Sequence, residues 1–173
     1  GSVIGVTLAC AIAVPLGLDG WLCAAAVSMA APWVQAIGRL RCLVQGCCHG
    51  APCTHGHGIT YRHPRSRVLA IAKLGGVEVH ATPLYSILSN VTLGSFLARL
   101  WSLGAPLSAI VGAYLLLAGL TRFVEEAHRG EPQTRIIAGL RFYQWCAIAL
   151  VAAGIAVSWF ATPVAPAAAL PNA

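Results

Sequence analysis

Charged side chains are scarce in this sequence. Only 9% of its 173 residues are Asp, Glu, Lys or Arg, whereas soluble domains carry about 25%. Because 58% of the residues are hydrophobic, so few charges cannot cover a surface that faces water. The composition therefore excludes a soluble globular domain and predicts an integral membrane protein.

Acidic residues and lysine are the rarest of the charged types. Five acids stand against eleven bases, and Lys73 is the single lysine among those bases. The planar guanidinium of arginine binds phosphate or carboxylate through two parallel hydrogen bonds, whereas the ammonium of lysine acts as a point charge. Because the bases flank apolar segments, we predict an anionic phospholipid headgroup as the partner, and not nucleic acid.

Five apolar segments have roughly the length that a membrane-spanning helix needs, about 20 residues. They cover approximately residues 2–18, 21–37, 83–101, 106–124 and 137–160. We therefore predict one all-α, multi-pass membrane domain over residues 1–161. The sequence shows no initiator Met and opens inside an apolar run, so we expect it to be a piece of a longer protein.

A polar region rich in Cys, His and Arg, residues 38–81, separates the second and third predicted spans. We expect it to be a loop, in which the apolar stretch 68–79 forms a short pair of strands or an interfacial segment. The Ala/Pro-rich tail, residues 162–173, is expected to be disordered.

The polar region carries four cysteines, at Cys42, Cys47, Cys48 and Cys53. Their spacing lacks the paired C-x2-C of a zinc knuckle. Three alternatives stay open: a disulfide, if this face meets an oxidising compartment; a metal site built from Cys47, Cys48, His49 and Cys53; and a cluster of thiols. We expect a structural or reactive thiol cluster without a metal or other cofactor.

Arginines stand at the ends of two apolar segments. Arg39 follows the second, while Arg122 and Glu126 close the fourth, with Arg129 three residues further on. Residues three or four apart share one face of a helix, so Glu126 can pair with both arginines beside it. Each arginine taken singly could simply extend to the membrane surface. As a set, they predict a polar cavity for one anionic headgroup.

Four motifs in this order resemble the prolipoprotein diacylglyceryl transferase family. That family shows G-R-x-G-N-F-x-N-G-E, H-P-x-x-L-Y-E, R-F-x-x-E-x-x-R and G-L-x-x-x-Q, and this chain has GRLRCLVQGC, HATPLYS, RFVEEAHR and GLRFYQ. The resemblance covers about residues 28–145. The positions in register include Ala31, Pro32, Gly38, Arg39, Gly46, His80, Leu84, Tyr85, Arg122, Phe123, Glu126, Arg129, Gly139, Leu140 and Gln144.

The resemblance implies a transferase of the bacterial cytoplasmic membrane. Such an enzyme moves diacylglyceryl from phosphatidylglycerol to the cysteine thiol of a lipoprotein precursor and releases glycerol phosphate. The resemblance assigns catalysis to His80, Tyr85 and Glu126, with Glu126 orienting the arginines beside it. It assigns substrate binding to Arg39, Arg122, Arg129, Gly38 and Gly46. The precursor's signal peptide is an implied second partner.

The chain departs from the family pattern at polar positions. Cys42 and Cys47 replace an Asn and a Glu of the first motif, Arg41 replaces its second Gly, and Ser86 replaces the final Glu of the second motif. Two alternatives therefore remain: a headgroup transferase with another acceptor, and a paralogue with a thiol-based redox or metal-binding function. The positive-inside rule places the basic segments in the cytoplasm, whereas the resemblance places them outside the membrane. We expect the orientation that the resemblance implies.

Overall fold

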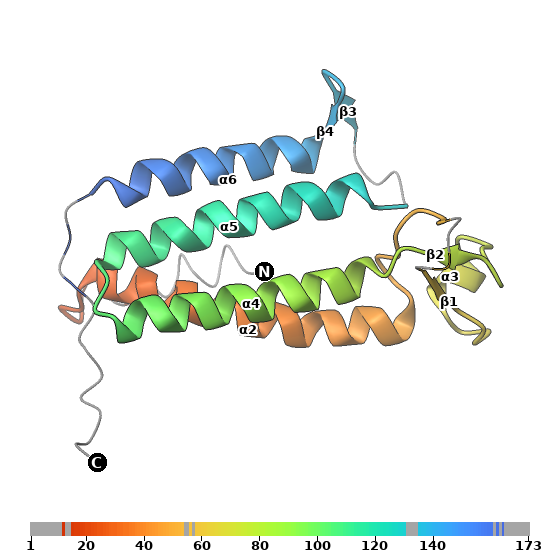
Figure 1. Ribbon diagram of the computed structural model, residues 1–173, viewed down its shortest axis with the longest axis horizontal. Helices are drawn as coiled ribbons and strands as arrows, with labels where there is room; N and C mark the ends of the chain where they lie inside the picture. Colours follow the sequence, from red (N-terminus) through yellow and green to blue (C-terminus); the bar gives the residue numbers. More distant parts are fainter. Residues whose placement is uncertain are drawn as a thin grey trace, which may run out of the picture.

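The computed structural model describes residues 12, 15–53, 56, 58–130, 135–160, 162 and 164. Long helices lie side by side in this part of the chain: α2 (Gly20–Gln45), α4 (Thr82–Ser102), α5 (Leu107–Ala127) and α6 (Phe142–Ser158). Figure 1 shows a small cap of short elements at one end of this bundle. Most of the first predicted span, residues 2–18, lies outside the described residues, as does most of the tail.

Helix α2 extends further than the sequence predicted. Asp19 caps its start by accepting a hydrogen bond from the backbone N–H of Trp21 at 2.8 Å. The helix continues through Gly38 and ends only at Gly46, which adopts a left-handed conformation with φ of 65°. The predicted loop is therefore wrong over residues 38–45. One glycine does not stop a helix, and the Leu, Arg and Gln residues that follow favour its continuation.

Helices α4 and α5 match the third and fourth predicted spans, 83–101 and 106–124, to within three residues at each end. Helix α6 begins later than the fifth because β3 (Ile136–Ile137) and β4 (Leu140–Arg141) form a hairpin before it. Ala138 and Gly139 connect the two strands, and both have positive φ, 48° and 80°. Two such central residues are typical of the tight turns that join antiparallel strands.

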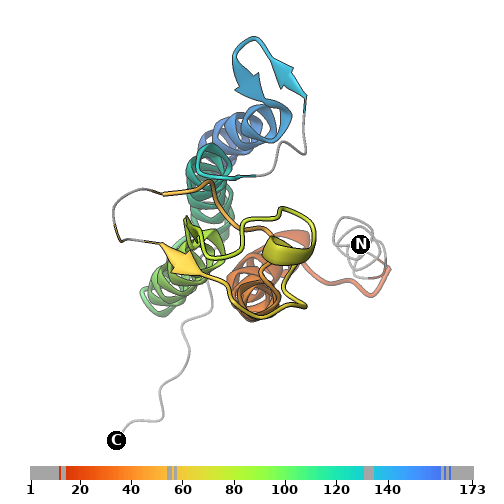
Figure 2. The same ribbon diagram turned by 90° about the vertical axis from the view of Figure 1, so that its right-hand side faces the viewer.

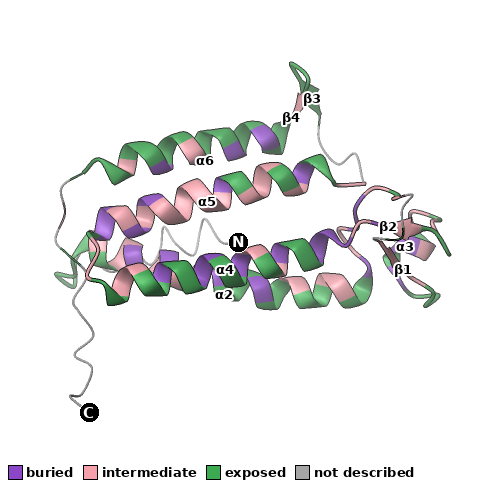
Figure 3. Ribbon diagram, viewed as in Figure 1, coloured by how far each residue is buried: buried purple, intermediate pink, exposed green. Residues whose placement is uncertain are grey.

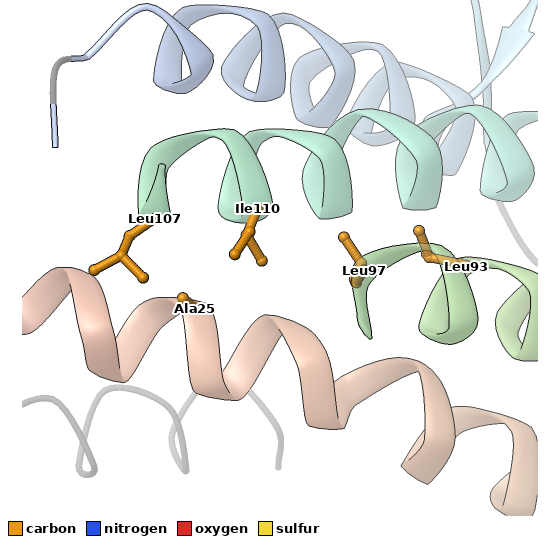
Figure 4. Close-up of a cluster of buried hydrophobic side chains, with 5 residues drawn as sticks. All are labelled: Ala25, Leu93, Leu97, Leu107 and Ile110. Carbon is orange, nitrogen blue, oxygen red and sulfur yellow. The ribbon is translucent and has the colours of Figure 1, made fainter. Parts of the chain in front are cut away.

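The hydrophobic core lies where α2, α4 and α5 meet. Figure 4 shows Ala25, Leu93, Leu97, Leu107 and Ile110 gathered there, and all five are buried. Helix α6 packs on α5, on the side that faces away from α2 (Figure 2). In Figure 3, exposed positions line the outer faces of the bundle. Many of these residues are large and apolar, including Val34, Ile37, Val44, Leu88 and Trp145.

Glycines allow α5 and α6 to approach closely. A Cβ atom on Gly154 would lie 2.6 Å from the backbone nitrogen of Leu116 and 2.7 Å from the carbonyl oxygen of Gly112. Small residues at such contacts are common between membrane helices, because there association depends on close packing.

Gly154→Ala is therefore expected to destabilise the fold by about 1–3 kcal/mol, because the added methyl group must push the two backbones apart. Gly38→Ala is the matched control, since nothing lies within 4 Å of a Cβ at that helical position. Thermal unfolding in detergent should show a lower midpoint for the first variant only. Equal midpoints for the two variants would contradict close packing at Gly154.

Two helices, α2 and α5, are long and apolar enough to cross a membrane, and α6 is a shorter apolar helix. The described part of the chain is thus mostly helical, with two candidate membrane-spanning helices. The count of five spans is not established by this criterion.

The cap contains α3 (Arg67–Ala70) and a pair of antiparallel strands, β1 (Ile59–Thr60) and β2 (Glu78–Val79). The stretch 68–79 thus provides part of a short helix and one strand, and its strand pairs with residues earlier in the chain. A further bridge joins Gly50 to Arg129. The cap therefore ties the segment after α2 to the end of α5.

Candidate functional site

At the capped end of the bundle, α2 ends, α4 begins and α5 ends (Figure 1). Residues in or next to these helices line a hollow there, which we call the arginine pocket. Its free volume is only about 10 Å³, room for about one water molecule, so the side chains nearly close it. Its lining consists of Arg39, Arg122, Arg129, Glu125, Thr82 and Cys48. Three arginines stand against Glu125 in the lining and Glu126 directly behind it, which leaves an excess of one positive charge, so the pocket favours an anion.

Glu126 lies beneath the pocket and holds two of its arginines. Its side chain is only 1% exposed. Its Oε2 atom lies 3.2 Å from Nη2 of Arg122 and 3.1 Å from Nη1 of Arg129, while Oε1 lies 3.9 Å from Nη1 of Arg141. A buried carboxylate with several cationic partners fixes the position of each of them.

Burial lowers the pKa of Arg129, but the hydrogen bond to Glu126 and the neighbouring Cys48 together raise it above its ordinary value. Arg129 therefore carries its positive charge at any working pH. This charge is permanent at the edge of the pocket.

Glu125 connects the remaining arginine to the same network. It lies 3.6 Å from Nη2 of Arg39 and 3.5 Å from Nη1 of Arg122. The Nε–H of Arg39 donates a hydrogen bond to Oγ of Ser86 at 3.1 Å. The guanidinium of Arg122 also lies over the ring of Tyr143, 5.4 Å from its centroid. Two helices that are remote in sequence thus direct arginines into one pocket.

A second hollow adjoins the arginine pocket between α4 and α5. Its free volume is about 260 Å³, and it is lined by Tyr85, Ser89, Leu120, Thr121, Val124 and Glu125. Nδ1 of His80 lies 3.4 Å from the hydroxyl oxygen of Tyr85, and the His80 ring stands edge-on to that of His128. His80 does not line the arginine pocket itself. The structure therefore places a polar and a mainly apolar hollow side by side, with Glu125 in both.

Three of the four predicted cysteines come together. The Sγ atoms of Cys42, Cys47 and Cys48, which we call the thiol triad, all lie within 4.8 Å of one another. Cys53 lies elsewhere in the cap, where its backbone N–H donates to the carbonyl oxygen of Glu78. Cys48 also lines the arginine pocket, and its Sγ accepts a hydrogen bond from Nη2 of Arg129 at 3.4 Å.

The alternative metal set of Cys47, Cys48, His49 and Cys53 is not assembled in the described part of the chain, because only its first two members belong to the triad. His49 is buried, at 2% exposure, outside the triad. All six cysteines in the described part of the chain are free thiols, so no disulfide forms among them.

The two glycines predicted to bind substrate, Gly38 and Gly46, lie in the backbone of α2 and at its C-terminal end, and not in the pocket. Gly46 ends α2, and a Cβ there would lie 3.0 Å from the side chain of Val68 and 3.2 Å from that of Tyr61. Gly38 is exposed on α2. Neither glycine lines the arginine pocket. Gly50, which the sequence did not single out, crosses so close to His80 that a Cβ would lie 2.4 Å from that residue's Cβ.

Sequence reasoning missed two charged members of the site. Glu125 stands three residues after Arg122, a spacing that could have identified it as a partner. Arg141 reaches Glu126 across the turn between α5 and α6 and donates to the carbonyl oxygen of Arg129 at 3.2 Å. No helical spacing signals that contact.

Burial raises the pKa of the Cys47 thiol to about 11, and the adjacent thiol of Cys42 adds to the effect. Because the thiolate is the nucleophile, alkylation of Cys47 by iodoacetamide should be slow at pH 7 and should accelerate up to about pH 11. The reaction of Cys53 is the comparison within the same chain. Peptide mapping after timed alkylation measures both, and a Cys47 rate that levels off near pH 8.5, the ordinary pKa of a thiol, would contradict this expectation.

Comparison with known proteins agrees with the arrangement of these motifs. A family model described as prolipoprotein diacylglyceryl transferase matches residues 1–160. The chain is 30% identical over 99 residues to phosphatidylglycerol–prolipoprotein diacylglyceryl transferase 2 of Clostridium perfringens, covering 57% of this chain and 36% of that protein. It is 24% identical over 102 residues to phosphatidylglycerol–prolipoprotein diacylglyceryl transferase of Clostridium tetani, covering 59% of this chain and 39% of the relative.

The chain thus spans little more than a third of the length of the curated relatives that it matches. The family match, in contrast, extends over nearly the whole sequence. It includes every residue of the arginine pocket and of the thiol triad. The chain belongs to the prolipoprotein diacylglyceryl transferase family.

Proposed function

We propose that this chain forms part of a multi-pass enzyme of the bacterial cytoplasmic membrane. The enzyme transfers diacylglyceryl from phosphatidylglycerol to the cysteine thiol of a lipoprotein precursor. The observation that carries the proposal is the convergence of Arg39, Arg122 and Arg129 on one pocket with excess positive charge. The names of the two relatives support the reaction class.

In the proposed reaction the acceptor thiolate attacks the glycerol carbon that carries the phosphate ester. A carbon–sulfur bond forms, the carbon–oxygen bond to phosphate breaks, and glycerol phosphate leaves with the electron pair. Negative charge therefore grows on the phosphate oxygens in the transition state. Arginines already held in position stabilise that charge without reorganising, and Glu126 supplies that positioning.

The acyl chains are proposed to enter the mainly apolar hollow between α4 and α5, which adjoins the arginine pocket. His80 and Tyr85 form the proposed catalytic pair, in which the imidazole accepts the proton of the acceptor thiol. Their 3.4 Å separation permits the tyrosine hydroxyl to orient the ring. The apolar segment 2–18 together with α2, α4, α5 and α6 would provide five membrane spans.

The capped end is proposed to face the outside of the cytoplasmic membrane. A membrane-impermeant maleimide should then label Cys53 in intact, reduced cells to the same extent as in lysed cells. Peptide mapping gives the labelled fraction, with Cys23, which lies inside α2, as the control that stays unlabelled. Labelling of Cys53 in lysed cells only would place this end in the cytoplasm.

The direct test combines the purified protein with phosphatidylglycerol vesicles and a peptide that carries the lipobox cysteine. Glycerol phosphate and the thioether-linked peptide should appear in equal amounts. Vesicles of phosphatidylethanolamine and a peptide with serine in place of cysteine are the controls. Failure to form either product with the complete mixture would contradict the transfer reaction.

A thiol-based function is the second candidate, because the chain places three cysteines together where the family pattern has an Asn and a Glu. It predicts redox or metal chemistry of these thiols without transfer of lipid. Counting free thiols beside the transfer assay separates the two candidates.

A further inference from the structure

The thiol triad brings together three cysteine sulfurs, atoms of a kind that can bind a metal ion. Cys42 lies in the last turn of α2, while Cys47 and Cys48 follow the left-handed Gly46. Cys48 itself has a φ of 59°, a conformation that side chains with a Cβ rarely adopt. Such a strained backbone conformation is retained only where the surroundings impose it. This tight turn returns two thiols toward the helix that carries the third.

Although the sequence alone led us to expect a thiol cluster without a metal, the placement of the three sulfurs leads us to a different inference. We propose that the thiol triad binds one thiophilic metal ion of the Cu⁺ or Zn²⁺ class. Thiolates select these soft ions, whereas Mg²⁺ and Ca²⁺ take oxygen ligands. A zinc–sulfur bond is about 2.3 Å long, so two sulfurs on one ion lie roughly 4 Å apart. The triad's sulfurs are all within 4.8 Å of one another, so small side-chain rotations suffice to close the site.

The number of ligands distinguishes this site from a structural zinc site. Structural zinc takes four protein ligands, and in the described part of the chain only three Cys, His, Asp or Glu ligand atoms gather here. The ion would therefore be three-coordinate, or would keep one open position for water or another small ligand. The spacing C-x4-C-C conceals the site in the sequence, because it lacks paired C-x2-C motifs.

The positive charge of Arg129 beside Cys48 favours the metal-bound state of the triad. Three thiolates around a divalent ion carry a net charge of −1, and around a monovalent ion −2. The guanidinium of Arg129 lies against Cys48, with Nη2 3.4 Å from Sγ. It therefore offsets this negative charge at the ion's edge. Binding of an ion at the triad depends only on these ligands, so its failure would leave the proposed transfer of lipid unaffected.

The test uses the full chain, purified in detergent and kept reduced with a phosphine. Titration with Cu⁺ or Zn²⁺ should give one bound ion per chain, and Cu⁺ should give a thiolate-to-metal charge-transfer band in the ultraviolet. Mg²⁺ is the hard-ion control and should not bind. Separate titrations with Cu⁺ and with Zn²⁺, each in the presence of a competing chelator, determine which ion binds more tightly.

Cys42→Ser, Cys47→Ser and Cys48→Ser should each abolish one-to-one binding, while the matched variant Cys53→Ser should retain it. Circular dichroism checks that each variant is helical. If a variant does not fold, alkylation of the unsubstituted chain provides the test. The bound ion should slow alkylation of all three triad cysteines and leave that of Cys53 unchanged. Absence of binding, binding that survives loss of a triad cysteine, or equal protection of Cys53 would overturn the proposal.

Discussion

Arg122→Lys is expected to lower the rate of diacylglyceryl transfer by about 10–100-fold. Lysine keeps the charge but cannot form two parallel hydrogen bonds to one phosphate. It also cannot contact Glu125 and Glu126 while facing the pocket, as the guanidinium of Arg122 does at 3.5 and 3.2 Å. A lost charge-assisted hydrogen bond is worth about 1.5–3 kcal/mol, and each 1.4 kcal/mol is about tenfold.

The matched control is Arg99→Lys, because Arg99 is exposed in the last turn of α4, at the end opposite to the pocket. That variant should transfer at the natural rate. Arg39→Lys should behave like Arg122→Lys, because Arg39 enters the same pocket from α2. The measurements are the release of glycerol phosphate and the binding of phosphatidylglycerol vesicles. Full activity and binding in both pocket variants would show that the arginines do not hold the phosphate.

The long helices were largely predictable because apolar runs and their breakers are local signals. The predicted spans 21–37 and 106–124 start within one residue of α2 and α5, which begin directly after Asp19 and Pro106. The end of α2 was not predictable from Gly38, because an isolated glycine weakens a helix by only about 1 kcal/mol. The continuation has a functional consequence, since it places Arg39 and Cys42 three residues apart on one helix, and their side chains enter the arginine pocket and the thiol triad.

The pairing of Glu126 with Arg122 and Arg129 could be inferred from helical spacing, because contacts three and four residues apart require only the helix. The contact of Arg141 with Glu126 required the tertiary fold. The hairpin of β3 and β4 and the glycine contacts of α5 and α6 bring that arginine back to the pocket. Tertiary contacts of this kind have no counterpart in local sequence patterns.

The thiol triad was only partly predictable. The sequence indicated that four cysteines lie close together around the end of α2, but their spacing did not distinguish Cys53 from the other three. The left-handed turn at Gly46 and Cys48 separates them, because it directs two thiols back to Cys42. Cys53 continues into the cap, where its backbone pairs with Glu78. Backbone geometry at two residues therefore decides which thiols share a site.

Glu126→Gln is expected to have the largest effect of any single substitution at the site. The side chain of Glu126 is 1% exposed and faces guanidinium groups of Arg122, Arg129 and Arg141. Removing one partner of a buried charge pair costs about 3–5 kcal/mol, and here the half-buried guanidinium groups would lose the carboxylate that they share. The glutamine amide is nearly the same size, so the loss is one of charge and not of packing.

The expected result is a strong decrease in transfer, together with a lower midpoint of thermal unfolding. Glu125→Gln is the matched comparison on the neighbouring position. Its side chain is 13% exposed and its contacts to arginine are longer, 3.5 and 3.6 Å. We therefore expect a smaller loss of stability from Glu125→Gln than from Glu126→Gln.

The shape of the pH–rate profile separates a positioning role of Glu126 from a role as general base. If Glu126 positions Arg122 and Arg129, its replacement lowers the rate at every pH and preserves the shape, because the titrating base is another residue. Binding of phosphatidylglycerol should weaken in parallel, since the misplaced arginines hold the phosphate in the ground state as well. Should Glu126→Gln instead remove the acidic limb of the profile and leave lipid binding unchanged, Glu126 is the base, and the arginines derive their positions from other contacts.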